Sequence, residues 1–164
     1  MSSVAAYWRV GVWVATAVLL AACGDDVDRD PGAGSSIDRY DAERQRCVDR
    51  INAFRATEGL APYERWQGIE LCTDSEAQSD SETGTAHGAF PQCGEQAQNE
   101  CPGWPSIDNT IEGCLQAMWE EGPGEPFSEH GHYINMSSTS YTKVACGFYV
   151  TDSGSVWAIQ NFAP

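Results

Sequence analysis

The seven cysteines of this 164-residue chain restrict its possible folds more than any other residue type, because each disulfide joins two distant backbone positions. The first of them, Cys23, follows a run without charged residues from Val10 to Ala22, and Arg9 precedes that run. A basic start, an apolar stretch and small residues before the processing site are typical of a secretory signal. The stretch is shorter than the roughly 20 residues that span a bilayer. Residues 1–22 are therefore predicted to be a lipoprotein signal peptide and Cys23 the lipidated N-terminus.

The remaining six cysteines form an even set. An exported chain meets an oxidising compartment, so we expect three disulfides rather than metal-binding thiolates. The sequence contains no Cys-x-x-Cys pair. Sequence alone does not fix the connectivity, and only Cys93 and Cys101 are close enough along the chain to suggest a local pair. The cysteines expected in disulfides are Cys47, Cys72, Cys93, Cys101, Cys114 and Cys146.

The rest of the chain divides into a tether and one domain. Residues 23–36, from the lipidated cysteine onward, show no apolar periodicity and are predicted to be a flexible tether. Residues 37–164 have the size of one domain. The formal net charge is −15, and after Arg65 the chain has fourteen Asp and Glu residues but one basic residue, Lys143. This negative charge disfavours nucleic acid and anionic lipid surfaces as partners and attracts cations.

Apolar periodicity predicts three helices and a terminal hairpin. Helical spacing runs from Ile37 to Phe54 before a glycine stop, more weakly over about 69–81, and again from Ile107 to Met118. Alternating residues over 143–150 and 156–162, joined by a turn, predict a β-hairpin. Residues 84–105, rich in glycine and proline, are expected to form a long loop held by disulfides. Together these elements predict an α+β fold with a sheet covered by helices.

The order of motifs resembles the CAP family, the cysteine-rich secretory, antigen 5 and pathogenesis-related proteins with an SCP domain. The family's first helix and turn are matched by VDRINAFRATEGLAPYERW (48–66), and its tryptophan-bearing helix by CLQAMWEEG (114–122). Its Gly-Glu-Asn step is matched by GEQ (94–96), and its closing motif and strand by GHYINMSSTSYTKVACGFYV (131–150) and VWAIQNF (156–162). The resemblance spans about residues 37–164. It implies a three-layer α-β-α sandwich with a central antiparallel sheet and a cleft.

The commonest site of that family is a cleft with two histidines and two glutamates. Carried over by position, these residues are His87, Glu95, Glu121 and His132. Many relatives place the second glutamate three residues after the tryptophan, where the present chain has Gly122. Glu121 is therefore the expected residue and Glu120 the alternative. A further alternative is a triad without this glutamate, since bacterial relatives often lack it.

Two chemical roles remain open for these four side chains. Imidazole and carboxylate groups can bind a divalent metal such as zinc, which makes His87 and His132 candidate metal ligands. The carboxylates can instead accept hydrogen bonds from the imidazoles and hold the cleft in shape without metal. The third histidine, His130, is expected at the surface, since a loop would not fix its ring on the same side as that of His132.

The leading hypothesis is a non-enzymatic or weakly active binding module, exported and lipid-anchored on the periplasmic or outer face of a bacterial membrane. Its partner would be a small molecule, a lipid or an envelope protein. One alternative is a metal-assisted hydrolase in which Glu95 orients a water molecule. A second alternative is a disulfide-hardened scaffold whose segment 84–105 contacts another envelope protein. No segment resembles the nucleophile elbow of a serine hydrolase.

Overall fold

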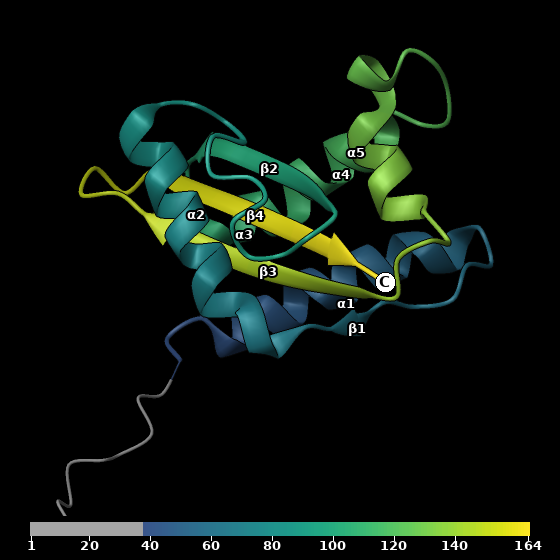
Figure 1. Ribbon diagram of the computed structural model, residues 1–164, viewed down its shortest axis with the longest axis horizontal. Coiled ribbons are helices and arrows are strands. Elements are labelled where there is room, and N and C mark those ends of the chain that lie inside the picture. The colour runs from purple at the N-terminus through teal and green to yellow at the C-terminus, as the bar shows by residue number, and fades with distance from the viewer. Residues whose placement is uncertain (1–37) are drawn as a thin grey trace, which may run out of the picture. The chain divides into compact units, whose positions relative to one another are not determined.

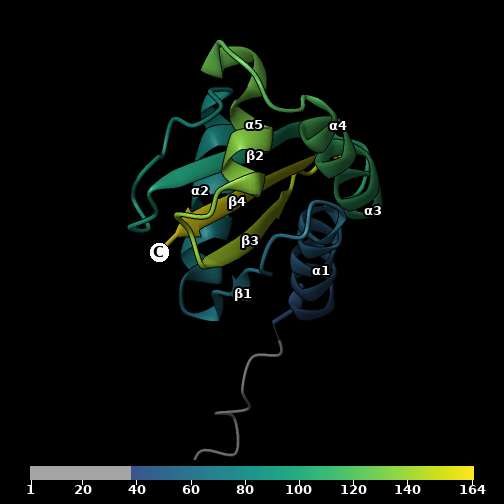
Figure 2. The same ribbon diagram turned by 90° about the vertical axis from the view of Figure 1, so that its right-hand side faces the viewer.

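The computed structural model describes residues 38–164. The predicted signal peptide, the predicted lipidation site Cys23, the whole predicted tether (23–36) and the predicted start of the domain at residue 37 lie outside the described residues. Within the described range, no helix combines the length and the hydropathy needed to cross a membrane. A four-stranded sheet lies between helices on its two faces (Figures 1 and 2). The expected α+β fold with three α-β-α layers is confirmed.

The helices and strands are short and follow one another closely. In chain order they are α1 (Asp41–Thr57), β1 (Glu64–Arg65), a 3₁₀ turn (Gln67–Ile69), α2 (Glu70–Thr83), β2 (Ala97–Trp104), α3 (Ile107–Asn109), a π-helical turn (Thr110–Cys114), α4 (Leu115–Glu120), α5 (Phe127–Ser137), β3 (Lys143–Val150) and β4 (Val156–Ala163). The predicted hairpin is β3 and β4, and the third predicted helix is the run from α3 to α4.

The strand order in the sheet is β1-β3-β4-β2. The three long strands pair antiparallel, as expected. The two-residue β1 adds a parallel pair at the edge of β3, so the sheet as a whole is mixed. Because β4 lies between β3 and β2, the C-terminal strand is central, and it joins segments that are far apart in the sequence.

The two faces of β3 pack against different helices. On one face, a Cβ placed on Gly147 would lie 2.5 Å from the backbone carbon of Thr73, so α2 lies directly against the strand. On the other face, Val144 and Phe148 belong to the apolar core together with Ile51 of α1. Figure 2 shows α2 and α1 on opposite sides of the sheet. The two covered faces make the sheet the middle layer.

All six domain cysteines are paired, which confirms three disulfides. The suggested local pair of Cys93 and Cys101 is wrong. Cys101 lies within β2 and joins the apolar core beside Cys114, whereas Cys93 precedes the strand and is bonded to α2. The disulfides are Cys47–Cys146, Cys72–Cys93 and Cys101–Cys114.

The predicted loop 84–105 contains a strand that periodicity did not indicate. Residues 97–104 form β2 and pair with β4. The buried part of this strand includes Gln98, Asn99 and Glu100, which are polar on both of its faces. Such a strand lacks the alternation of apolar and polar residues by which strands are recognised.

The expectation of a loop around His130 is also wrong, because residues 127–137 form α5. The glycine within this helix, Gly131, has a packing reason: a Cβ there would lie 2.9 Å from the ring of Phe127. His130 and His132 are two positions apart in the sequence. Because each residue of an α-helix is rotated relative to the one before it, their side chains lie on different sides of α5.

Candidate functional site

A groove of about 570 Å³ lies where α5 meets β2 and the segment that precedes it. Its walls include His87 and Phe90 from that segment, Gln98 from β2, and Phe127 and His132 from α5. The groove therefore brings together the two histidines that the family resemblance singled out, although they are 45 positions apart in the sequence.

His132 is held by Glu121, the residue that follows α4. The imidazole Nδ1–H donates to one carboxylate oxygen of Glu121 at 2.5 Å. The other oxygen accepts the backbone N–H of His132 at 3.0 Å and that of Tyr133 at 3.3 Å. Glu120 instead accepts a hydrogen bond from Gln116. One carboxylate thus fixes both the backbone and the ring orientation of His132.

His87 is held in a comparable way by different residues. Its φ of 59° lies in the left-handed region, which is uncommon for a residue other than glycine. The backbone N–H of His87 donates to the buried carboxylate of Glu100 at 2.5 Å. Its ring Nδ1–H donates to the side-chain oxygen of Gln98 at 2.8 Å. Strained backbone that is held by specific contacts often occurs at functional sites.

Both rings therefore have the same arrangement of protons. In the neutral imidazole, an Nδ1 that donates a hydrogen bond leaves Nε2 with a lone pair, and both rings donate through Nδ1. Within residues 38–164, neither Nε2 forms a hydrogen bond. A hydrogen bond at one imidazole nitrogen commonly orients the other nitrogen toward a metal or a polar ligand.

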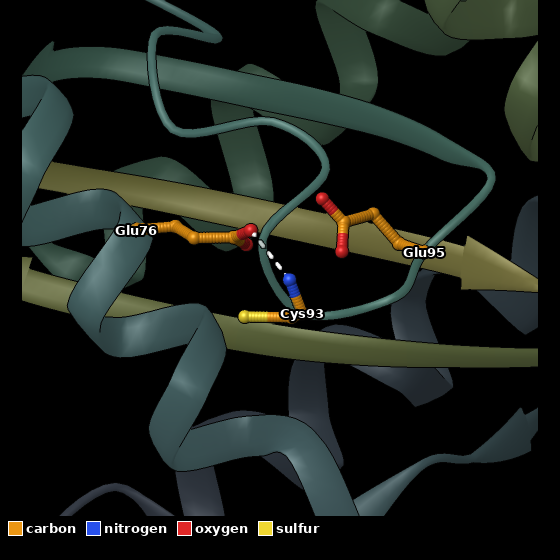
Figure 3. A group of neighbouring side chains, drawn as sticks. All are labelled: Glu76, Cys93 and Glu95. Carbon is orange, nitrogen blue, oxygen red and sulfur yellow. Dashed lines mark hydrogen bonds between the residues drawn. The ribbon is translucent and has the colours of Figure 1, made fainter.

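Glu95 does not take the position that the resemblance gave it. Gln98 is the side chain beside His87, and Glu95 is not among the residues that line the groove. Its carboxylate is 4% exposed and lies beside Glu76 and Cys93 (Figure 3). The predicted tetrad is not assembled as one set. The groove combines the two histidines with Glu121 and Gln98.

Glu95 was predicted as a member of the cleft tetrad because it follows a glycine, as the glutamate does in the Gly-Glu-Asn step of the family. Which residue meets His87 is decided instead by the pairing of β2 with β4, where Gln98 is opposite Asn161. The same side-chain amide of Gln98 donates to Asn161 and is thereby fixed in orientation. No local sequence signal shows this pairing.

The fit of a metal to the groove can be judged from the donor atoms. His87 and His132 offer two imidazole nitrogens, which suit zinc. In the part of the chain that the structure describes, the only three ligand-type side chains with donor atoms close together are Glu76, Cys93 and Glu95. Zinc in the groove would therefore have at most these two histidines as protein ligands and would need water or a bound molecule to complete its coordination.

His130 has a structural contact outside the groove. It is partly buried, and its Nδ1 lies 2.8 Å from the carbonyl oxygen of Glu121 and 3.0 Å from that of Gly122. The ring thus caps the chain where α4 ends. A His-x-His metal pair with His132 has no support from this geometry.

Residues 38–164 thus form a disulfide-bonded α-β-α sandwich domain with a groove that is lined by two oriented histidines. Family comparison gives the same result, since residues 48–162 match the Cysteine-rich secretory protein family, CAP. The chain belongs to this family. A comparison with curated protein sequences finds no significant match.

Solved structures with the same fold are distant in sequence. BmVAL-1 is 17% identical, with a TM-score of 0.57, and the match covers 74% of this chain and 76% of that one. NaASP2 with Zn²⁺ is 13% identical, with a TM-score of 0.54 and coverage of 76% and 80%. Venom allergen-like protein 4 of Schistosoma mansoni is 11% identical, with a TM-score of 0.51 and coverage of 74% and 88%. At these identities the likeness establishes the fold.

Proposed function

We propose that this chain is an exported, lipid-anchored binding module whose groove takes up a small, largely apolar ligand with a polar end. Residues 1–22 serve as the signal peptide, Cys23 carries the lipid, residues 24–36 form the tether, and residues 37–164 form the binding domain. The order of basic, apolar and small residues before Cys23 supports the export and anchoring. Replacing Cys23 with serine should release the exported protein from the membrane fraction.

The observation that carries the binding function is the pair of oriented imidazoles in a groove with apolar walls. Phe90, Phe127, Ile134 and Tyr141 supply apolar and aromatic surface. The two Nε2 atoms supply polar groups without a partner in the described protein. Pockets with mostly apolar walls and a few convergent polar groups are typical of small-molecule sites. A volume of about 570 Å³ lies within the usual range for such ligands.

Zinc is the metal that we propose for the two imidazoles. One solved structure of the same fold, NaASP2, was determined with Zn²⁺. The zinc content of the purified protein tests this part of the proposal. We expect stoichiometric zinc in the wild type and in the control His130→Ala, and its loss in the double variant His87→Ala, His132→Ala. Zinc-free wild-type protein would refute the metal part and leave ligand binding to be tested separately.

A fluorescent apolar probe, 1-anilinonaphthalene-8-sulfonate, tests the groove itself. Ile134→Trp places a large side chain in the groove wall and should lower probe binding by at least tenfold. Leu71→Trp is the matched control, because Leu71 is 72% exposed on α2 and does not line the groove. Equal probe binding by the two variants would contradict a ligand site at this position.

The two alternative functions, a metal-assisted hydrolase and an interaction scaffold, have less support than the binding module. The hydrolase required Glu95 to orient a water molecule, and Glu95 does not line the groove. The scaffold required segment 84–105 to be a surface loop, whereas 97–104 is a strand whose first five residues are buried.

A further inference from the structure

The space between α2 and the sheet contains four buried carboxylates. Glu76 and Asp80 come from α2, Glu95 from the segment before β2, and Glu100 from β2, and each is at most 4% exposed. Across residues 38–164 no lysine or arginine forms an ion pair with any of them. The one imidazole that approaches is that of His87, 3.8 Å from Glu100. Burying carboxylates without cations is costly, so a positive partner or a proton must compensate them.

The hydrogen bonds leave much of this cluster unsatisfied. Both oxygens of Glu95, one oxygen of Asp80 and one of Glu100 are buried and accept no hydrogen bond. These four atoms are the majority of the six buried side-chain atoms without a partner in the described residues. Buried polar groups in folded proteins are almost always satisfied, and an unsatisfied set commonly marks an absent ion or water. Glu95 is the extreme case: among the described residues no N–H or O–H group donates to either of its oxygens, and its carboxyl faces that of Glu76.

Glu76 and Glu95 are arranged to share one partner. An oxygen of Glu76, an oxygen of Glu95 and the sulfur of Cys93 all lie within 4.8 Å of one another. In Figure 3 the two carboxylates extend toward each other from α2 and from the segment before β2. Glu76 is already fixed, because it accepts the N–H of Cys93 at 3.2 Å and the amide of Asn161 at 2.6 Å.

The donor atoms decide which ion fits. The sulfur of Cys93 is bonded to Cys72 and is not a thiolate, so the site lacks the ligand that soft metals prefer. Carboxylate oxygens suit hard cations. Calcium–oxygen distances are about 2.3 to 2.6 Å, so oxygens up to roughly 5 Å apart can contact one ion. Calcium also accepts bidentate carboxylates and irregular geometry, whereas magnesium requires a near-octahedral shell and retains its waters.

We propose that Glu76 and Glu95 bind a Ca²⁺ ion between α2 and the segment that leads into β2. Glu95 contributes its two unpartnered oxygens, Glu76 contributes a fixed carboxylate, and water completes the coordination. The ion would attach the segment of His87 and Phe90 to α2, next to the Cys72–Cys93 disulfide. Neither of its two ligands lines the groove, although the amide of Gln98 in the groove wall donates to Glu76 at 3.4 Å. The test measures calcium and does not depend on a ligand in the groove.

Thermal unfolding of the purified mature protein at pH 7.5 tests the proposal, with EDTA treatment followed by addition of Ca²⁺ alone. Calcium at about 100 times its Kd should raise the Tm of the wild type by about 10 °C. Glu95→Gln should lose this shift. Without calcium, Glu95→Gln should unfold at or above the wild-type temperature, because it removes a buried charge, and this separates lost binding from failed folding. Glu82→Gln, at an exposed position on the same helix, should keep the full shift.

Three outcomes would overturn the calcium site. The first is a wild-type Tm that does not respond to calcium, as expected if a shared proton and not an ion compensates the two carboxyls. The second is a shift that persists in Glu95→Gln. The third is an equal shift with Mg²⁺ at the same concentration, which would contradict the assignment to calcium.

Discussion

Arg44 of α1 is expected to be the most important single charged residue for stability. Its side chain is completely buried and connects all three layers of the fold. The guanidinium donates to Asp74 of α2 at 2.7 and 3.0 Å, to Asp38 at 2.7 and 3.1 Å, and to the carbonyl of Cys146 in β3 at 2.8 Å. Arg44→Met keeps much of the apolar stem and removes all of these contacts.

The magnitude follows from what the substitution leaves behind. Asp74 would keep one hydrogen bond, from the N–H of Phe148. Burial already holds the pKa of Asp74 above its ordinary value, even with Arg44 present. Breaking a buried ion pair from one side costs about 3 to 5 kcal/mol. Because the Asp74 side chain is 22% exposed, water can compensate part of this cost, and we expect about 3 kcal/mol.

The matched control is Arg46→Met, two residues along the same helix. Arg46 is 46% exposed and pairs with Asp108, which is 74% exposed. Exposed pairs of this kind contribute about 0 to 1 kcal/mol. Urea unfolding followed by circular dichroism measures the free energy of unfolding of both variants. A second control, Asp74→Asn in the Arg44→Met background, should recover part of the loss because it removes the unpaired charge. The reasoning is refuted if Arg44→Met and Arg46→Met differ by less than 1 kcal/mol.

Three further predictions concern packing, pH and the covalent framework. Gly147→Ala should lower the free energy of unfolding by about 1 to 3 kcal/mol, measured in urea, because its Cβ would overlap the α2 backbone. Burial raises the pKa of Glu76 and of Glu100 from 4.5 to about 7, so the folded chain binds more protons than the unfolded chain in this range. In EDTA, the free energy of unfolding should therefore fall by about 3 kcal/mol for each of these two carboxyls as the pH rises from 4.5 to 7. A urea midpoint that does not change over this pH range would contradict this prediction. Replacing Cys47 and Cys146 by alanine removes a disulfide with a sequence separation of 99. This change should lower the free energy of unfolding by about 4 to 5 kcal/mol, because the unfolded chain is no longer restricted. A loss below about 1 kcal/mol would contradict this restriction of the unfolded chain.

Features with a strong local signal were predictable from the sequence. The first helix was expected from Ile37 to Phe54 and is observed as Asp41–Thr57, with the N–H of Gly59 returning to the carbonyl of Ala56. The terminal hairpin was predicted nearly to its ends, because alternating residues and a turn are encoded within about 20 positions. In contrast, β2 was taken for loop, since its buried residues on both faces include amides and carboxylates.

The α+β class, the six cysteines of the disulfides and the two histidines that line the groove could all be identified from the amino-acid sequence. It also placed Glu121 among the candidates that accompany His132. The disulfide pairing, the contact of His87 with Gln98 in place of Glu95, and the position of Glu95 beside Glu76 became visible only in the folded chain. These contacts depend on the register of β2 against β4 and on the packing of α2 against the sheet. Both are set by burial and backbone pairing between distant segments, which leave no periodic trace in the chain.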